Sequence, residues 1–512
     1  MRERRRALGS ALVGAALLLT AACSAGDSGE GGGAAPDQTL AVGQTIGIAQ
    51  LDPNVTTLTA ERVMWNLLWD GLTRVATDGQ IEPELAEEWE VSEDQLTWTF
   101  TLRDDVTFHD GRSFTAEDAA ANIARILDPD LASPQRAKLT QITDAVAVDE
   151  ATLELTLSAP MPQLPAALVD VKMVDPQTLE DINSTANGTG PFMLDSFVPD
   201  QELVVVPNPD YWEGAPALDE VRVTKYADMT SAQSALTAGT IDVLWSVPFD
   251  QIASQEAAGM TTVVPDDPSQ AAVLLVDNLS APFDDPVARQ ALSYATDRET
   301  IQAASFGGLG ELNAGSTLVS PTNPYAADDL PAYDYDLERA AELFAEAGVT
   351  EGDSFICWSQ TAAHYKTTCE ILQQSLAEIG ITLDIETNEP STWAARFYPA
   401  GKEYEGLIVP NYLSREGAPL PFVVDYFGDG GWSESNWPST AEYEEVKEEI
   451  RSATEEDVLQ QAFGSFQHIM NEEQPMVSIL NVAQPSMAGE HVQGVWMESN
   501  GTIHVEGAEQ AP

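Results

Sequence analysis

The sequence predicts a mixed α/β fold with more than one sheet. The chain has 512 residues, which at ~150 residues per domain suggests roughly three structural units. Hydrophobic residues make up 43% of the chain, so a large core can be buried and wholesale disorder is excluded. Segments with the periodicity of strands and of helices alternate without a repeat period, which is typical of α/β proteins.

The individual elements follow from local patterns. Residues 96–102 alternate apolar and polar side chains with period two and predict a strand. Thr115 precedes two acidic residues and predicts the N-cap of a helix that runs to about Leu127. Gly348 and Gly380 predict the ends of two later helices. Together the predicted elements are strands at 39–48, 96–102, 152–157, 203–206 and 381–385, and helices at 59–72, 115–127, 284–306, 337–347, 368–379 and 440–471.

The N-terminus has the features of an export signal. Four arginines within the first six residues form a positive region, and residues 11–22 form an apolar run too short to span a bilayer as a helix. Small residues directly before Cys23 resemble a bacterial lipoprotein signal, in which that cysteine is lipidated; an ordinary secretory signal cut nearby is the alternative. We predict a signal peptide at 1–22 and a flexible tether at 23–38. No second apolar run approaches ~18 residues.

The charge balance excludes one class of partner. The chain has 23 Lys and Arg against 83 Asp and Glu, a net charge of −60. Residues 1–22 hold four Arg and one Glu, so the remainder has 19 bases and 82 acids, a net charge of −63. Such a surface repels nucleic acid, and we expect no nucleic-acid partner.

Two further cysteines, Cys357 and Cys369, lie twelve residues apart. Export permits a disulfide, which we favour as a link between a strand and the helix after it. Two buried free thiols are the alternative. Two cysteines alone are too few for a metal site.

Several blocks, kept in order between residues 39 and 494, resemble one known family. The longest is LTWTFTLRDDVTFHDGRSFTAEDAAANIARILDP at 96–129. The others are PELAEEW at 83–89, GTGPF at 188–192, NPDYW at 208–212, ALTAGTID at 235–242 and VARQALSYATDR at 287–298. Together they are similar to the family 5 extracellular solute-binding proteins, the peptide- and nickel-binding components of bacterial ABC importers. Within the blocks, His109 is interpreted as a hydrogen-bonded turn residue, and Arg289 and Arg298 as scaffold on one helix.

The resemblance implies a two-lobed α/β fold of the periplasmic-binding-protein kind (type II). Lobe I is expected at 39–275, with an extra subdomain at about 73–168, and lobe II at 276–483. Residues 484–512 return to lobe I, and 272–283 and 477–487 are the expected crossing segments of the hinge. Solute then binds between the lobes, which close and present it to a membrane permease. No cofactor is expected, and the protein is expected to be a monomer anchored through Cys23 on the outer face of the membrane.

The solute-binding residues are predicted from one stretch and from scattered aromatic and polar residues. In peptide-binding relatives a Trp-x-x-Asp-Tyr-x-x-Pro stretch lines the pocket, and the matching region is 411–419. Tyr412 then replaces the Trp, and Arg415 lies near the Asp position, where a cation favours a carboxylate or another oxygen-rich group. Glu416 would restore an amine anchor if the register shifts by one, and a surface ion pair is the structural alternative for Arg415. The other candidates are Thr56, Thr57, Trp393, Arg396, Trp432 and Asn436, with Lys366 as a candidate partner for a peptide carboxylate.

Metal binding and catalysis are both disfavoured. The five histidines show no clustered ligand spacing, so no metal site is expected, although a metal chelate held through its organic part stays open. The chain has no Gly-x-Ser-x-Gly, His-Glu-x-x-His or Walker motif, and we predict a binding protein rather than an enzyme. The alternatives are an exported hydrolase with a glycosidase-type carboxylate pair and a surface sensory or adhesive module. The sequence therefore favours capture of a peptide or a similarly sized organic solute.

Overall fold

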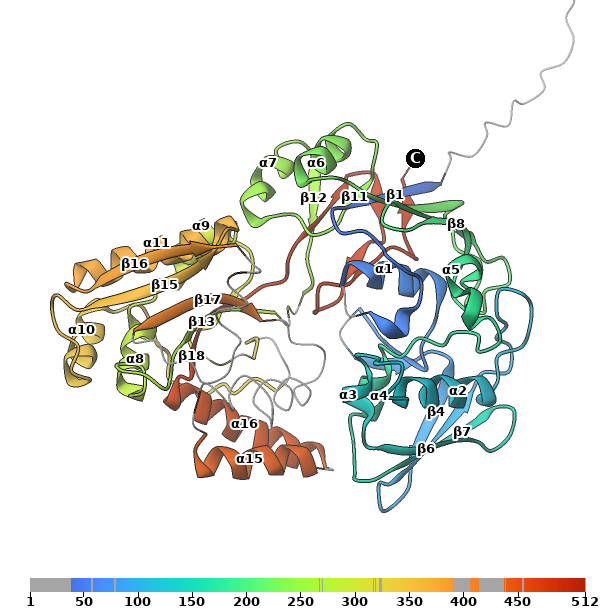
Figure 1. The fold of residues 1–512 in the computed structure, drawn as a ribbon, viewed down its shortest axis with the longest axis horizontal. Coiled ribbons are helices and arrows are strands. Elements are labelled where there is room, and N and C mark those ends of the chain that lie inside the picture. The colour runs from blue at the N-terminus through green and yellow to red at the C-terminus, as the bar shows by residue number, and fades with distance from the viewer. Residues whose placement is uncertain are drawn as a thin grey trace, which may run out of the picture. The chain divides into compact units, whose positions relative to one another are not determined.

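The computed structural model describes most of the chain after the N-terminal segment (Figure 1). The described residues are 38–511 except 57–58, 78–79, 267, 269, 316, 318, 322–324, 390–391, 393–405, 414–436, 438 and 454.

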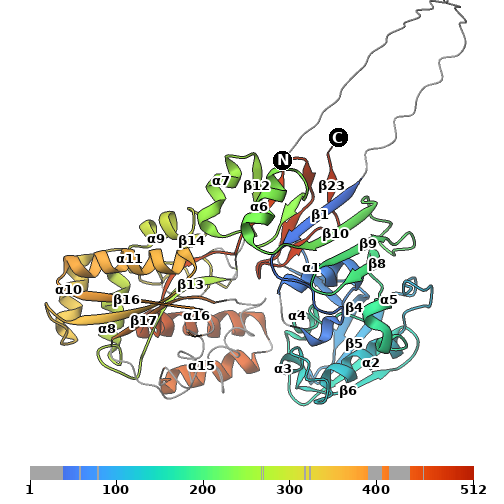
Figure 2. The ribbon, with the colours of Figure 1, turned by 45° about the horizontal axis from the view of Figure 1, so that its top comes forward.

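A seven-stranded sheet combines the first half of the chain with a strand near its C-terminus. Its order is β12 (Met260–Val263), β19 (Ser486–Gly489), β11 (Val243–Leu244), β1 (Thr39–Gln44), β10 (Glu220–Lys225), β9 (Glu202–Pro207) and β8 (Phe192–Val198). Strand β1 is parallel to β10 and β11, and the outer pairs are antiparallel. Figure 2 shows β1, β10, β9 and β8 side by side. Trp65 and Trp69 of the α1 region (helix Thr59–Leu68) pack against this sheet with Leu40 and Val42.

A four-stranded antiparallel sheet has a separate core. Its order is β4 (Ala86–Val91), β5 (Thr97–Leu102), β7 (Thr152–Leu157) and β6 (Ile142–Ala147). Strands β5 and β7 bury every second residue, as the period-two pattern predicted. Helix α2 (Ala116–Leu127) buries Ile123 and Ile126 in the same core, which extends from Leu72 to Met173.

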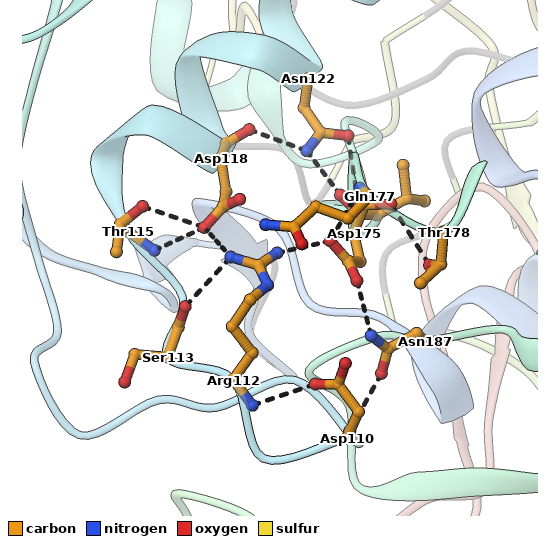
Figure 3. Close-up of polar contacts among 11 residues, drawn as sticks. Asp110, Arg112, Ser113, Thr115, Asp118, Asn122, Asp175, Gln177, Thr178 and Asn187 are labelled. Atoms are coloured by element: carbon orange, nitrogen blue, oxygen red, sulfur yellow. Dashed lines mark hydrogen bonds and ion pairs between the residues drawn. The ribbon is translucent and has the colours of Figure 1, made fainter.

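Helix α2 begins as predicted at Thr115. The Thr115 backbone N–H donates to the Asp118 carboxylate, 3.0 Å away, and the two residues form a capping box. Arg112 joins this cap to a distant loop, because its guanidinium pairs with both Asp118 and Asp175 (Figure 3). Asn187 then donates to Asp175 at 2.7 Å. This part of the 96–129 block is therefore structural.

Residues 271–481 are built around a six-stranded sheet. Its order is β14 (Glu311–Leu312), β18 (Met476–Asn481), β13 (Ala271–Val276), β17 (Leu407–Leu413), β15 (Ser354–Gln360) and β16 (Thr382–Asn388). Leu274 of β13 faces the hydrophobic cluster formed with α8 (Pro286–Tyr294), α9 (Arg298–Ser305), α10 (Leu337–Glu346) and α11 (Ala363–Glu378). Val273 faces the cluster formed with α15 (Ala441–Ser452) and α16 (Glu456–Glu473). Figures 1 and 2 show α9 and α11 on one side of the sheet and α15 and α16 on the other.

The chain passes between the two large sheets twice. The first passage lies between β12 and β13, at residues 264–270, and the second between β18 and β19, at residues 482–485. The first passage therefore precedes the expected crossing segment 272–283, whose first five residues belong to the buried strand β13. The second passage lies within the expected segment 477–487.

Two long predicted helices are each divided in the structure. The segment 284–306 forms α8 (Pro286–Tyr294) and α9 (Arg298–Ser305), because the Asp297 carboxylate accepts the Thr300 backbone N–H and starts a new helix. The segment 440–471 forms α15 (Ala441–Ser452) and α16 (Glu456–Glu473), separated by extended backbone at Ala453. Arg289 and Arg298 therefore lie on two helices. Both are buried and donate to backbone carbonyls, in agreement with the scaffold interpretation.

The remaining predicted helices occur close to their expected bounds. Helix α10 (Leu337–Glu346) and helix α11 (Ala363–Glu378) are followed by Gly348 and Gly380, both with positive φ. The structure contains a disulfide between Cys357 of β15 and Cys369 of α11, with Cα atoms 6.2 Å apart. Among the described residues, no helix is both long and apolar enough to cross a membrane. The shorter elements are η1 (Pro53–Val55), β2 (Thr73–Val75), β3 (Ile81–Pro83), α3 (Arg136–Leu139), α4 (Leu164–Leu168), η2 (Leu179–Asp181), α5 (Ile182–Thr185), α6 (Met229–Thr237), η3 (Phe249–Gln251), α7 (Ile252–Glu256), β20 (Val492–Gln493), β21 (Trp496–Met497), β22 (Ile503–His504) and β23 (Glu509–Gln510).

Candidate functional site

The structure describes only part of the predicted solute site. Thr56 is described with its side chain, and Tyr412 is described as a backbone position in β17. Outside the described residues lie Thr57, Trp393, Arg396, Arg415, Trp432 and Asn436, as does the predicted lipidation site Cys23.

Thr56 follows a short turn that is held by its own N-cap. The Asp52 carboxylate accepts the Asn54 backbone N–H at 3.1 Å, which starts the 3-10 turn η1 at Pro53. Thr56 ends this turn in an extended conformation and is 8% exposed. The turn therefore fixes where the chain enters the predicted site.

Two side chains and one backbone carbonyl, from three distant segments, hold the same turn. Arg125 of α2 binds both carboxylate oxygens of Asp52, with a distance of 3.2 Å from Nη1 to Oδ1. The Asn54 side-chain amide donates to the Lys172 carbonyl at 3.1 Å, and Asn183 accepts the Leu51 backbone N–H at 2.7 Å. The bidentate pair between Arg125 and Asp52 couples the helix over the four-stranded sheet to the Thr56 turn.

The second predicted segment begins where the six-stranded sheet meets the passages. Strand β17 runs antiparallel to β13, and Tyr412 lies opposite Ala272, while Leu413 lies opposite Ala271. Asn481, the last residue of β18, also lies opposite Ala271. Strand β17 therefore ends, at Leu413, at the edge of the sheet where the chain passes to the seven-stranded sheet.

Polar contacts that sequence reasoning missed link the two passages. Gln270 accepts the Gln484 backbone N–H at 3.1 Å and donates to the Asn500 carbonyl at 3.2 Å. The Gln484 side chain donates to the Val247 carbonyl, and Trp245 donates its indole N–H to the Gly501 carbonyl at 3.4 Å. No local sequence pattern marks these residues, because their partners are more than 200 positions away.

The described histidines are structural in character. His109 lies within hydrogen-bonding distance of the Ala186 and Gly190 carbonyls, and burial lowers its pKa, in agreement with the turn interpretation. Burial lowers the pKa of His364 to about 4, and its ring lies 5.4 Å from that of Phe249 and 5.7 Å from that of Phe306. Within the described ranges, no group of three or more His, Cys, Asp or Glu residues could hold a metal ion.

Lys366 lies on α11 in an exposed ion pair. Its ammonium is 3.4 Å from the Glu370 carboxylate, one helical turn away. Such a pair on a helix surface explains Lys366 without a solute.

Comparison with known proteins agrees with the motif analysis. The family described as "Bacterial extracellular solute-binding proteins, family 5 Middle" matches residues 80–433. The glutathione-binding protein GsiB of Salmonella typhi is 27% identical over 485 residues, which cover 91% of this chain and 92% of that protein. The nickel-binding periplasmic protein of Escherichia coli (strain K12) is 29% identical over 391 residues, covering 71% of this chain and 73% of that protein.

The fold has a solved counterpart. The crystal structure of the ABC transporter substrate-binding protein CtaP (Lmo0135) from Listeria monocytogenes has a TM-score of 0.82 at 21% identity, covering 93% of this chain and 100% of that chain. The predicted two-lobed, type II fold is thereby confirmed, and the relatives are solute-binding proteins rather than enzymes. Since the family match covers more than half of the sequence, the chain belongs to the family 5 extracellular solute-binding proteins of bacterial ABC importers.

Proposed function

We propose that this protein captures a peptide or a similarly sized organic solute between its two lobes and delivers it, chemically unchanged, to an ABC permease. The observation that carries the proposal is the family match over residues 80–433. Similarity to GsiB over nine-tenths of the chain supports a peptide-like solute, since that relative is named for glutathione, a tripeptide.

The topology supports opening and closing by a hinge. The seven-stranded and six-stranded sheets are joined only by the two passages at 264–270 and 482–485, as far as the described strands show. Short connections of this kind absorb the backbone rotation of hinge motion. We place the lobe boundaries at these passages, with the four-stranded sheet as an extra subdomain of the first lobe.

The solute contacts remain those predicted from the sequence. Thr56 and Thr57 contribute one side, and the other is contributed by Trp393, Arg396, Tyr412, Arg415, Trp432 and Asn436. A cation at Arg415 favours a carboxylate on the solute. The contribution of Thr56 is supported by the three contacts that hold its turn.

Native mass spectrometry of the protein purified from its own cells tests the function. We expect a co-purifying organic molecule, released intact on unfolding, and a rise in Tm when glutathione or the released molecule is added back. Small-angle scattering should then show a smaller radius of gyration with solute. A covalently altered solute, or no response to peptides and other organic solutes, would contradict the proposal.

Arg415→Ala and Trp432→Ala test the predicted pocket. We expect Arg415→Ala to weaken binding of a carboxylate-bearing solute by about tenfold or more, because a charge-assisted hydrogen bond is lost. Trp432→Ala should reduce the change in tryptophan fluorescence on binding. Half-buried Trp89, on the four-stranded sheet, supplies a control as Trp89→Phe. Unchanged affinity or an unchanged signal would remove the respective residue from the pocket.

We also propose a lipid anchor at Cys23. The apolar run before it and the Gly/Ala/Ser-rich segment after it support this modification. Cys23→Ser should release the protein from membranes in a fractionation experiment, and a Ser24→Ala variant should stay bound. Membrane retention of Cys23→Ser would contradict the anchor.

A further inference from the structure

A cavity of about 610 Å³ is lined by residues from the first half of the chain and from its C-terminal segment. Its walls come from α1 and from the segments 70–84, 169–172, 211–217 and 496–509, with Pro191. None of the described lining residues belongs to 271–481, the part that contains the six-stranded sheet. The volume lies in the range of pockets that hold small molecules.

Most charged side chains that line the cavity form ion pairs or hydrogen bonds with other residues of the protein. Arg62 pairs with Asp170 at 2.7 Å, and Arg74 pairs with Glu213 at 2.9 Å. Asp70 accepts from the Tyr211 hydroxyl at 3.2 Å and from the Trp212 indole at 3.3 Å.

The Lys172 ammonium differs from these groups. Lys172 is only 5% exposed and lines the cavity, and among the described residues no hydrogen bond or close ion pair holds its ammonium. The carboxyl groups of Glu84, Asp70 and Asp170 lie near enough to interact with it electrostatically. Its backbone carbonyl is held by Asn54, which fixes where the side chain starts. Because none of these carboxyl groups contacts the ammonium directly, a ligand oxygen would offset part of its desolvation cost.

Glu84 lines the same cavity and has one oxygen committed. Its Oε2 accepts the Gly71 backbone N–H at 2.6 Å. Burial raises the pKa of Glu84 to about 8, while Lys172 and Arg74 oppose this and Asp70 adds to it. At neutral pH the carboxyl is therefore mostly protonated, and it can donate a hydrogen bond to an acceptor in the cavity.

We propose that this cavity is a second binding site, separate from the solute site between the lobes, and that it takes a small molecule with a carboxylate group. The ligand carboxylate accepts from the Lys172 ammonium, and the Glu84 carboxyl supplies a second hydrogen bond. Both donors would be satisfied by one acidic group, whereas a ligand ammonium would be repelled by Lys172.

Acetate, succinate and citrate test the site, with acetamide and glycerol as neutral probes. Binding is measured by calorimetry and by Tm at pH 6.5, always against NaCl of equal ionic strength, because salt alone screens the −60 charge. We expect at least one carboxylate, and neither neutral probe, to bind saturably. Absence of carboxylate binding beyond the NaCl control would overturn the proposal.

Two variants locate the binding. Lys172→Met should weaken it by tenfold or more. Lys138→Met is the matched control, because Lys138 faces Asp170, at 3.1 Å, but does not line the cavity. Unchanged carboxylate binding in Lys172→Met would assign the ligand to another site and overturn the second site, without affecting the proposed transport function.

The pH profile provides a test if Lys172→Met fails to fold. The charged and titratable groups facing Glu84 are Asp70, Arg74, Lys172 and Tyr211. Wild-type affinity should fall severalfold as pH rises through about 8, because Glu84 then ionises and repels the carboxylate. Glu84→Gln should bind at pH 6.5 and lose this decline. The same decline in Glu84→Gln would overturn the assigned contact.

Discussion

At the scale of single residues, His504 shows how burial and charge compete. It lies on β22 with its two ring nitrogens 2.6 Å from Glu498 and 2.5 Å from Glu506, and its ring stacks on Trp496. Burial alone lowers the pKa of His504, but Glu506 and Glu498 outweigh it and raise the pKa to about 10. The imidazolium and its two carboxylates therefore form an ion-pair cluster in the C-terminal segment.

The ion-pair cluster around His504 predicts a pH-dependent contribution to the free energy of unfolding. The folded pKa of His504 lies above its ordinary value of 6.5, so its contribution is fully present below pH ~6.5 and is lost as pH rises through about 10. Near pH 6, we expect His504→Gln to cost about 3 kcal/mol of unfolding free energy, because the buried Glu498 carboxylate and the half-buried Glu506 carboxylate lose their cation.

Urea unfolding at pH 6, 8 and 10.5 measures this difference, which should shrink toward high pH. His468→Gln is the control, since the ion pair of His468 with Asp329 is exposed and should change stability by less than ~0.5 kcal/mol. A constant difference between wild type and His504→Gln across the range would contradict the assigned charge.

At the scale of elements, contacts between distant segments position the predicted solute turn. The turn at Pro53–Val55 belongs to neither large sheet, and its position depends on Arg125 of α2. Helix α2, which packs on the four-stranded sheet, therefore holds the turn that precedes Thr56.

Arg125→Gln is expected to loosen this turn. Amide hydrogen exchange of residues 49–56 should accelerate, and solute affinity should fall by about three- to tenfold, because the turn is no longer ordered before binding. Arg136→Gln is the control, since Arg136 donates to the Leu127 carbonyl and, within the described part of the chain, makes no contact with the turn. Equal exchange rates in both variants would show that Asp52 holds the turn alone.

The division between α8 and α9 depends on a single carboxylate. Asp297 accepts the backbone N–H of Thr300 at 3.0 Å and its hydroxyl at 2.7 Å. Asp297→Ala should lower the free energy of unfolding by about 1 kcal/mol, the usual cost of a lost N-cap. Urea denaturation measures the loss, which Asp297→Asn should largely restore; no loss in Asp297→Ala would contradict the role of the cap.

The disulfide links strand β15 of the six-stranded sheet to helix α11, the next helix along the chain. Cys357 and Cys369 are both fully buried and close a loop of twelve residues. Replacing both by Ala should lower the free energy of unfolding by about 2–3 kcal/mol, as expected for a short closed loop. Equilibrium unfolding of the double variant beside the oxidised wild type measures the loss, and equal stability would contradict it.

At the scale of the whole molecule, the acidic surface opposes compactness. The chain has a net charge of −60, and its excess carboxylates repel one another more in the compact folded state than in the expanded unfolded chain. The Tm should therefore rise by several degrees as NaCl is increased from about 10 to 300 mM, where the Debye length falls below about 10 Å. Differential scanning calorimetry checks this, and a flat or falling Tm would contradict dominant self-repulsion.

Much of the fold followed from local sequence patterns. The alternation in residues 97–102, the Thr115 cap and the glycines at 348 and 380 are short-range signals, and the structure confirms them. The breaks inside 284–306 and 440–471 were missed because the helical periodicity continues across them. The predicted site could be tested less, since most of its residues lie outside the described part of the chain.

The sequence by itself determined the family and the mixed α/β class, because ordered motifs and local periodicity need no tertiary contacts to be read. Only the tertiary structure decided which buried charges meet. Arg125 reaches Asp52 across 73 positions, Asn66 lies beside His504 across 438, and Lys172 shares one cavity with Glu84. Whether a buried cation is paired depends on these approaches in space, and sequence spacing does not encode them.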